Sequence, residues 1–216
     1  MKDTLTQISI VLDRSGSMSA VRDATISGFN EFIDGQKAVP GEAHISLVQF
    51  DTEDAYEVLY EAKPIRDVPK MTVETYVPRG GTPLHDAIGR TIDGLGAKLA
   101  KMSEAERPGK VVIVIMTDGL ENSSKEYSSA QIAEMIKHQR EAYKWEFVFL
   151  GANQDAILTG EKLNIPQRSS MTYAATAAGA RNALRAFSSS LGSYRTGASE
   201  DMSFTQEDRE KAKRAK

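Results

Sequence analysis

Hydroxyl and carboxyl side chains gather in three short segments of this sequence: residues 13–17 (DRSGS), 80–82 (GGT) and 117–119 (TDG). The first and the third directly follow apolar runs that are typical of buried strands. Apart from His85, nothing softer than oxygen lies near these segments in the sequence. Because hydroxyls and carboxylates suit hard cations, the segments predict a site for Mg²⁺, with Mn²⁺ or Ca²⁺ as alternatives.

The spacing within residues 13–17 has a physical reason. Asp13, Ser15 and Ser17 alternate along an extended, turning segment, so all three side chains can point to one side, and Gly16 lets the backbone bend between them. A simpler interpretation is a strand, a turn and a helix that Ser17 or Ser19 caps. This segment alone does not separate the two interpretations, whereas the three segments together favour the metal site.

Strands and helices alternate along most of the chain. We expect strands near residues 8–12, 44–50, 56–60, 111–116, 147–150 and 169–173. We expect helices from Ser17 or Ser19 onward and near residues 84–102, 132–143, 156–163 and 176–191, with a loop over 64–79. This order predicts an α/β fold: a doubly wound, mostly parallel sheet with one antiparallel edge strand. Ligands of such sheets bind at the carboxyl ends of the strands, and the three polar segments lie at strand ends or in loops.

We expect one domain over residues 1–191 and a flexible, polar C-terminal tail over residues 192–216. The tail is basic near its end, and contact with an anionic partner is the alternative to a solvated tail. Its basic residues are Arg209, Lys211, Lys213, Arg214 and Lys216.

The composition narrows the class of protein. The 216 residues carry a formal net charge of −3 and no cysteine. We therefore exclude disulfide and thiolate chemistry and do not expect nucleic-acid binding. No signal-peptide pattern is present, and no apolar run approaches the roughly 20 residues that cross a bilayer. We expect a cytoplasmic protein with no membrane contact.

In their order and spacing, the three segments resemble the metal-site loops of von Willebrand factor A (vWA) domains. The resemblance extends over residues 7–191 and includes the buried strand before Asp118. It implies a Rossmann-like fold that carries a metal-ion-dependent adhesion site (MIDAS). It also implies an intact site in a stand-alone, intracellular member of the bacterial or phage type.

The resemblance assigns metal-site roles to five residues. Ser15 and Ser17 would coordinate the metal directly, and Thr82 would do so directly or through a water molecule. Asp13 and Asp118 would act mainly through water molecules or would accept hydrogen bonds from the residues that bind the metal. Arg14 lies where the family is variable, and we assign it no ligand role.

The charge of such a site suggests how it works. Neutral hydroxyls fill several positions around the cation, which therefore remains electrophilic and accepts a carboxylate from outside. The sequence thus predicts a protein-binding module that captures an Asp or Glu of a partner protein, with no catalytic residues and no organic cofactor. One alternative is an accessory subunit of a separately encoded ATPase or of a stress or tellurite-resistance complex. Another is a metal-assisted hydrolase, for which Asp13, Asp118 and His85 are the candidate groups.

Three further features have a functional and a structural interpretation. His85 would touch a ligand at the rim of the site or simply lie at a helix start. Asn153 and Asp155 follow another strand and would widen the binding surface, although Asp155 also suits a helix cap. Residues 122–124 (NSS) spell a glycosylation acceptor that no secretion signal supports.

Overall fold

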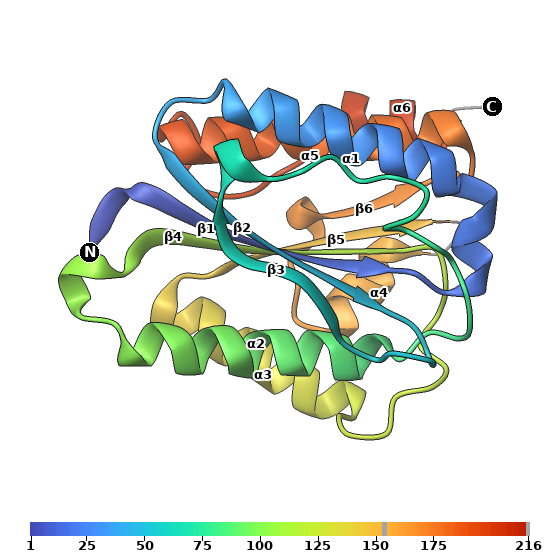
Figure 1. Ribbon diagram of the computed structural model, residues 1–216, viewed down its shortest axis with the longest axis horizontal. Helices are drawn as coiled ribbons and strands as arrows, with labels where there is room; N and C mark the ends of the chain where they lie inside the picture. The colour runs from blue at the N-terminus through green and yellow to red at the C-terminus, as the bar shows by residue number, and fades with distance from the viewer. Residues whose placement is uncertain (153–154, 215–216) are drawn as a thin grey trace.

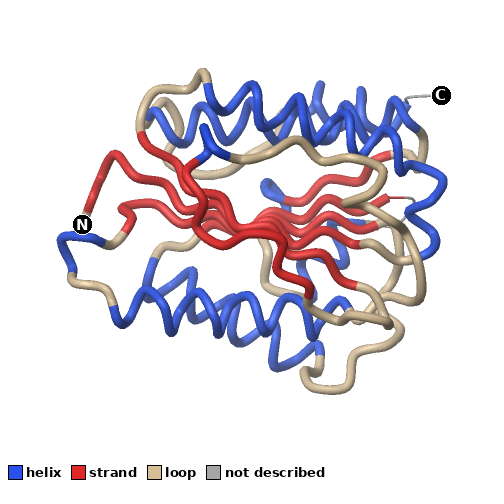
Figure 2. Tube along the Cα trace, viewed as in Figure 1, coloured by secondary structure: helices blue, strands red, loops and turns tan. Residues whose placement is uncertain are grey.

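The computed structural model describes residues 1–152 and 155–214. Six strands form one sheet in the order β3-β2-β1-β4-β5-β6, and a layer of helices covers each of its faces (Figures 1 and 2). The strands are β1 (Lys2–Asp13), β2 (Glu42–Phe50), β3 (Glu57–Pro64), β4 (Pro108–Thr117), β5 (Glu146–Ala152) and β6 (Ser170–Tyr173).

The topology is that of a doubly wound sheet with one antiparallel edge. Strand β1 pairs in parallel with β2 and β4, and the parallel pairing continues from β4 to β5 and from β5 to β6. Strand β3 returns through a hairpin and pairs antiparallel with β2. The predicted fold class is confirmed, and the carboxyl ends of β1, β2, β4 and β5 lie along one edge of the sheet. We call this edge the carboxyl edge; it is on the right in Figure 1.

The helices divide between the two faces (Figure 1). One face carries α1 (Arg22–Lys37), α5 (Ala177–Thr196) and α6 (Gln206–Arg214). The other carries α2 (Leu84–Lys101), α3 (Ser129–Tyr143) and α4 (Ala156–Lys162). Short 3₁₀ helices are η1 (Gly16–Val21), η2 (Ile65–Asp67), η3 (Glu104–Glu106) and η4 (Gln167–Ser169).

Alternating side chains of the central strands build two hydrophobic cores. Ile8, Ile10 and Leu12 of β1 belong to the core beneath α1 and α5, whereas Val11 belongs to the core beneath α2 and α3. Strand β4 is buried on both faces from residue 111 to residue 117, as its run of apolar residues predicts. In the described part of the chain, no helix combines the length and apolarity that crossing a membrane requires.

The end of the chain differs from the expected flexible tail. Helix α5 continues to Thr196, and α6 packs on α5 and beside β6. Three apolar side chains anchor this segment, because Met202, Phe204 and Ala212 are all buried. The sequence prediction weighed the polar composition of residues 192–216 and overlooked these three positions.

Of the basic residues that were expected to be solvated, Arg209 is partly buried, whereas Lys211, Lys213 and Arg214 are exposed. Arg209 donates hydrogen bonds to the carbonyls of Gln167 and Arg168 at 2.9 and 3.0 Å. Lys211 and Arg214 form ion pairs within α6 with Glu207 and Glu210, both at 2.6 Å. Lys216 lies outside the described residues.

Candidate functional site

The two central strands bring the first and third polar segments together. In the register of β1 and β4, Leu12 lies opposite Met116, so Asp13 and Thr117 end neighbouring strands. The Thr117 hydroxyl donates a hydrogen bond of 2.5 Å to Asp13 Oδ2, and the Ser15 amide donates one of 2.6 Å to Asp13 Oδ1. Asp13 is thus fixed by hydrogen bonds from both segments.

The serine hydroxyls join the same cluster. Ser15 Oγ lies 3.1 Å from Ser17 Oγ, and the Ser17 hydroxyl donates a hydrogen bond of 2.6 Å to Asp118 Oδ1. Neither serine caps a helix, because η1 and α1 both begin without a side-chain capping bond, and α1 starts only at Arg22. A 3₁₀ helix, η1, begins at Gly16 and leads directly into α1, which matches the predicted helix start near Ser17. The capping role predicted for Ser17 or Ser19 finds no support.

Thr82 completes the cluster from the second segment. A Cβ atom placed on Gly119 would lie 3.2 Å from Thr82 Oγ1 and 3.7 Å from Ser17 Oγ. The missing side chain at Gly119 thus leaves room where hydroxyls of the first and second segments converge. All five predicted residues, Asp13, Ser15, Ser17, Thr82 and Asp118, therefore lie together at the carboxyl edge.

Burial divides this cluster into a floor and a rim. Asp13, Ser15 and Thr82 are buried, Asp118 is partly exposed and Ser17 is exposed. Beyond the rim, Leu120 is 65% exposed. The cluster is thus buried on one side and open to solvent on the other.

The environment makes both carboxylates costly to ionise. Burial raises the pKa of Asp13 to about 6, although hydrogen bonds from Thr117 and Ser15 oppose the shift. Burial likewise raises the pKa of Asp118 above its ordinary value, against the hydrogen bond from Ser17. A cation beside these carboxylates would favour their charged forms.

Two further residues hold the cluster in place: Tyr76, which the sequence analysis did not single out, and Asn122, which it named only as part of a glycosylation acceptor. The buried Tyr76 donates its hydroxyl to the Asp13 carbonyl at 2.7 Å. Asn122 Oδ1 accepts the Thr82 amide at 2.9 Å, and the Asn122 amide donates to the Thr82 carbonyl at 3.2 Å. No sequence pattern announces these long-range contacts, and the side chain of Asn122 is engaged with Thr82 in the segment that spells a glycosylation acceptor.

The remaining candidates lie outside the cluster. The His85 amide donates to Glu121, whose carboxylate is 3.8 Å from the imidazole, and burial lowers the pKa of this histidine. Asp155 caps α4 by accepting the Leu158 amide at 3.1 Å, which matches the structural interpretation. Asn153 lies outside the described residues.

The cluster fits a hard cation by its chemistry. It offers three hydroxyls and two carboxylates, and the hydroxyls of Ser17 and Thr82 lie nearest the space beside Gly119. Residues 1–152 and 155–214 contain no group of three or more His, Cys, Asp or Glu side chains that could hold a metal. A site at this cluster would therefore have to use its hydroxyls, which are ligands that Mg²⁺, Mn²⁺ and Ca²⁺ accept.

The fold and the site define a doubly wound α/β domain with an oxygen-lined cluster at its carboxyl edge. The family model of the von Willebrand factor type A domain matches residues 6–163, so the chain belongs to this family. No curated protein matches the chain.

Solved structures share the fold at low sequence identity. Proximal thread matrix protein 1 (PTMP1) from the mussel byssus superposes with a TM-score of 0.63 and 15% identity, over 85% of this chain and 47% of that chain. A second PTMP1 structure has a zinc-occupied MIDAS motif and gives a TM-score of 0.62 at 15% identity, with the same coverage of 85% and 47%. A von Willebrand factor type A protein from Catenulispora acidiphila gives 0.61 at 16% identity, over 86% of this chain and 42% of that chain. This chain thus spans less than half the length of each of these chains.

Proposed function

We propose that this chain is a metal-dependent protein-binding module that captures an Asp or Glu side chain of a partner protein. The observation that carries the proposal is the convergence of five oxygen-bearing side chains from three segments on one open position at the carboxyl edge. Membership of the vWA family and the zinc-occupied MIDAS motif of PTMP1 support it.

The five residues of the cluster would have two different roles in metal binding. Ser15, Ser17 and Thr82 would hold the ion, Mg²⁺ first and Mn²⁺ or Ca²⁺ as alternatives. Asp13 and Asp118 would balance its charge and orient the hydroxyls. A bound dication supplies an electrophilic position for an incoming carboxylate.

The distribution of burial favours a ligand from outside the chain. The buried floor excludes solvent from one side of the cluster, which strengthens electrostatic attraction there, while Ser17 leaves the other side accessible. The hydroxyls that would hold the ion directly are neutral, so the ion would remain electrophilic toward a carboxylate from a partner.

Ion binding tests the site directly. We expect isothermal titration to show one Mn²⁺ or Mg²⁺ site in the wild type and at least tenfold weaker binding in Ser17→Ala, because a ligand is lost. Ser19→Ala is the matched control, since Ser19 is an exposed serine two residues away. Equal affinities in all three proteins would contradict the site.

Capture from native cells tests the partner. Immobilised wild-type protein with Mg²⁺ should retain a protein that a chelator elutes, and Asp118→Ala should retain none. Mutation of acidic residues in the captured partner should then abolish binding. Capture that persists in the presence of chelator would contradict a metal-dependent mode.

We propose no catalytic role for the cluster. Both carboxylates already accept hydrogen bonds from neighbouring groups, and the His85 side chain lies next to Glu121. Assays for phosphatase, nuclease and esterase activity, with and without Mg²⁺, test this directly. A Mg²⁺-dependent activity lost in Ser17→Ala would favour the hydrolase alternative.

A further inference from the structure

Asp51, the first residue after β2, is a fully buried carboxylate at the carboxyl edge. Its Oδ1 accepts the amides of Glu53 and Asp54 at 2.6 and 2.9 Å, which closes the turn between β2 and β3. Its Oδ2 accepts the Nε of Arg14 at 2.7 Å and the Nε of Arg79 at 3.0 Å. Burial would raise the pKa of Asp51, but these hydrogen bonds outweigh it and hold the pKa below its ordinary value.

The two arginines belong to different segments of the proposed metal site. Arg14 lies between Asp13 and Ser15, and Arg79 directly precedes the segment that ends in Thr82. The backbones of these segments meet as well. The Arg79 amide donates to the Arg14 carbonyl at 2.8 Å, and the Gly16 amide donates to the Gly80 carbonyl at 3.0 Å. Asp51 thus binds both segments beside the place where they join.

The turn that Asp51 closes also touches the second segment. Thr52 Oγ1 accepts the Gly81 amide at 2.9 Å. Gly80 has a φ of +65°, and a Cβ atom there would lie 2.5 Å from Thr52 Oγ1. The fit between the turn and the glycine pair therefore depends on the conformation of residues 51–54.

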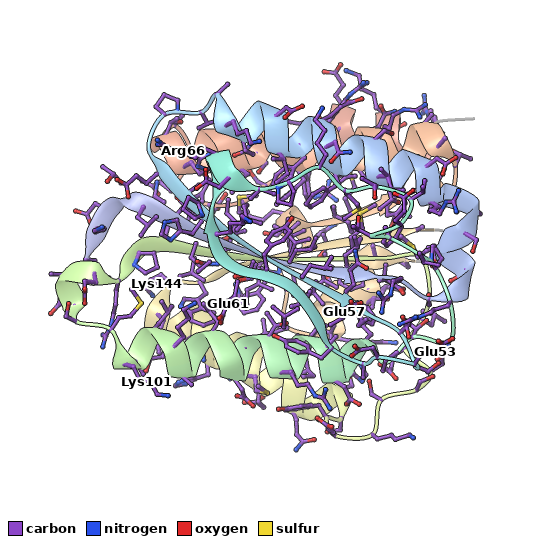
Figure 3. All side chains as sticks on the ribbon, viewed as in Figure 1. Glu53, Glu57, Glu61, Arg66, Lys101 and Lys144 are labelled. Carbon is purple, nitrogen blue, oxygen red and sulfur yellow. The ribbon has the colours of Figure 1, made fainter. Side chains whose placement is uncertain are left out.

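Charge gives Asp51 a second effect on the site. Arg14 is 5% exposed, and its guanidinium points away from the cluster toward Asp51, Gln49 and Glu57. Figure 3 labels Glu57 on β3 and Glu53 at the nearby turn. Without Asp51, the buried cation of Arg14 would lose one of its two carboxylate partners beside a site that must attract a dication.

We infer that Asp51 is a positioning residue that holds residues 13–17 and 80–82 in register through Arg14 and Arg79, so that Thr82 faces Ser15 and Ser17. The functional role of Asp51 rests on the proposed metal site. The relative position of the two segments does not, and it can be measured without metal.

The test compares Asp51→Asn with the wild type in chelator. Asparagine keeps the shape and one acceptor oxygen for the turn but removes the carboxylate that the arginines share. We expect amide hydrogen exchange at Gly16, Arg79 and Gly81, followed by NMR, to become at least tenfold faster. Glu146→Gln is the control, because Glu146 is a partly buried carboxylate at the start of β5, at the opposite end of the sheet, where it accepts the Met202 amide at 3.2 Å. Its exchange at the three amides should stay within twofold of the wild type.

A Mn²⁺ titration of the same proteins then tests whether Asp51 supports metal binding. Asp51→Asn should bind Mn²⁺ at least tenfold more weakly, and water-proton relaxation by the bound ion should rise as water replaces the Thr82 hydroxyl. The control Glu146→Gln should leave both readouts unchanged.

The outcomes separate the two proposals. Faster exchange in Asp51→Asn without Mn²⁺ binding by the wild type would support the register and contradict the proposed function. Unchanged amide exchange in Asp51→Asn would overturn the positioning role. So would Mn²⁺ affinity and water-proton relaxation equal to those of the wild type, if the wild type binds Mn²⁺. If Asp51→Asn does not fold, Arg79→Gln decides, because Arg79 is partly exposed and its loss should raise exchange at Gly81 in the same direction.

Discussion

Asp13 is fully buried and accepts side-chain hydrogen bonds from two neutral groups, the Ser15 amide and the Thr117 hydroxyl. Burial raises its pKa to about 6 from its ordinary value of 3.8. A carboxyl group with a raised pKa in the folded state stabilises the fold below its unfolded pKa, and this contribution is lost as the pH rises through about 6. Ionised Asp13 therefore destabilises the metal-free protein at neutral pH.

Asp13→Asn should make the metal-free protein more stable at pH 7, by up to about 3 kcal/mol. The mutant should also lose the part of the stability decline that the wild type shows between pH 4 and pH 7. Urea unfolding in chelator across this pH range measures both effects.

Asp23→Asn serves as the control, because the side chain of Asp23 is 82% exposed. Its unfolding free energy should follow the pH dependence of the wild type. An Asp13→Asn protein that is less stable than the wild type at pH 7 in chelator would contradict the cost assigned to the buried charge.

The five clustered residues were accessible to prediction because each lies in a short polar segment, and the first and third segments directly follow predicted strands. The sequence also indicates, more weakly, that Asp51 lies at the carboxyl edge, because this acidic residue directly follows the predicted strand at 44–50. The partners of Arg14 were not predictable, because they depend on how the β2–β3 hairpin folds back beside β1. The contact of Asn122 with Thr82 joins residues 40 positions apart and has no periodic pattern.

Helix α6 closes one edge of the sheet. The Ala174 amide, directly after β6, donates to the Ala212 carbonyl at 3.0 Å, and Asn182 of α5 donates to the Lys211 carbonyl at 3.1 Å. Ala212 itself is fully buried. The helix thus covers backbone groups beside the edge strand β6, which limits pairing with other chains there.

Ala212→Asp should detach α6, because it would bury a charge in a space that fits a methyl group. We expect a loss of about 3 kcal/mol or more in stability and faster proteolytic cleavage between residues 197 and 205. Limited proteolysis followed by mass spectrometry locates the cut. Lys213→Asp places the same side chain at the neighbouring exposed position and should be cut no faster than the wild type.

The elements that the sequence predicted well are those with strong periodicity. The runs at residues 111–116 and 147–150 became the buried strands β4 and β5, and the amphipathic pattern from Leu84 became α2. Helix α6 was missed because a mean composition hides single apolar anchors. The helix predicted from Ser17 or Ser19 begins as the 3₁₀ helix η1 and becomes α-helical at Arg22.

Across the whole molecule, the candidate site draws on residues 13–17, Thr82 and Asp118, which only the complete sheet brings together. A ligand that binds the folded state and not the unfolded chain raises stability according to its concentration. At 100 times its dissociation constant, Mg²⁺ should add about 2.7 kcal/mol and raise the melting temperature by roughly 5–10 °C.

Thermal melts with Mg²⁺ and with chelator measure this shift. Ser17→Ala should melt at nearly the same temperature in both conditions, whereas Ser19→Ala should behave as the wild type. Equal shifts in wild type and Ser17→Ala would point to non-specific effects of the ion.

The wide spacing of these segments along the chain has a kinetic consequence. An ion that needs ligands from all three segments cannot bind until β1 and β4 have paired, so it contributes little to the early steps of folding. Once bound, the ion slows unfolding, because the central strands cannot separate without releasing it. Divalent cations should therefore lengthen the lifetime of the folded chain, and its resistance to proteases, without speeding its formation.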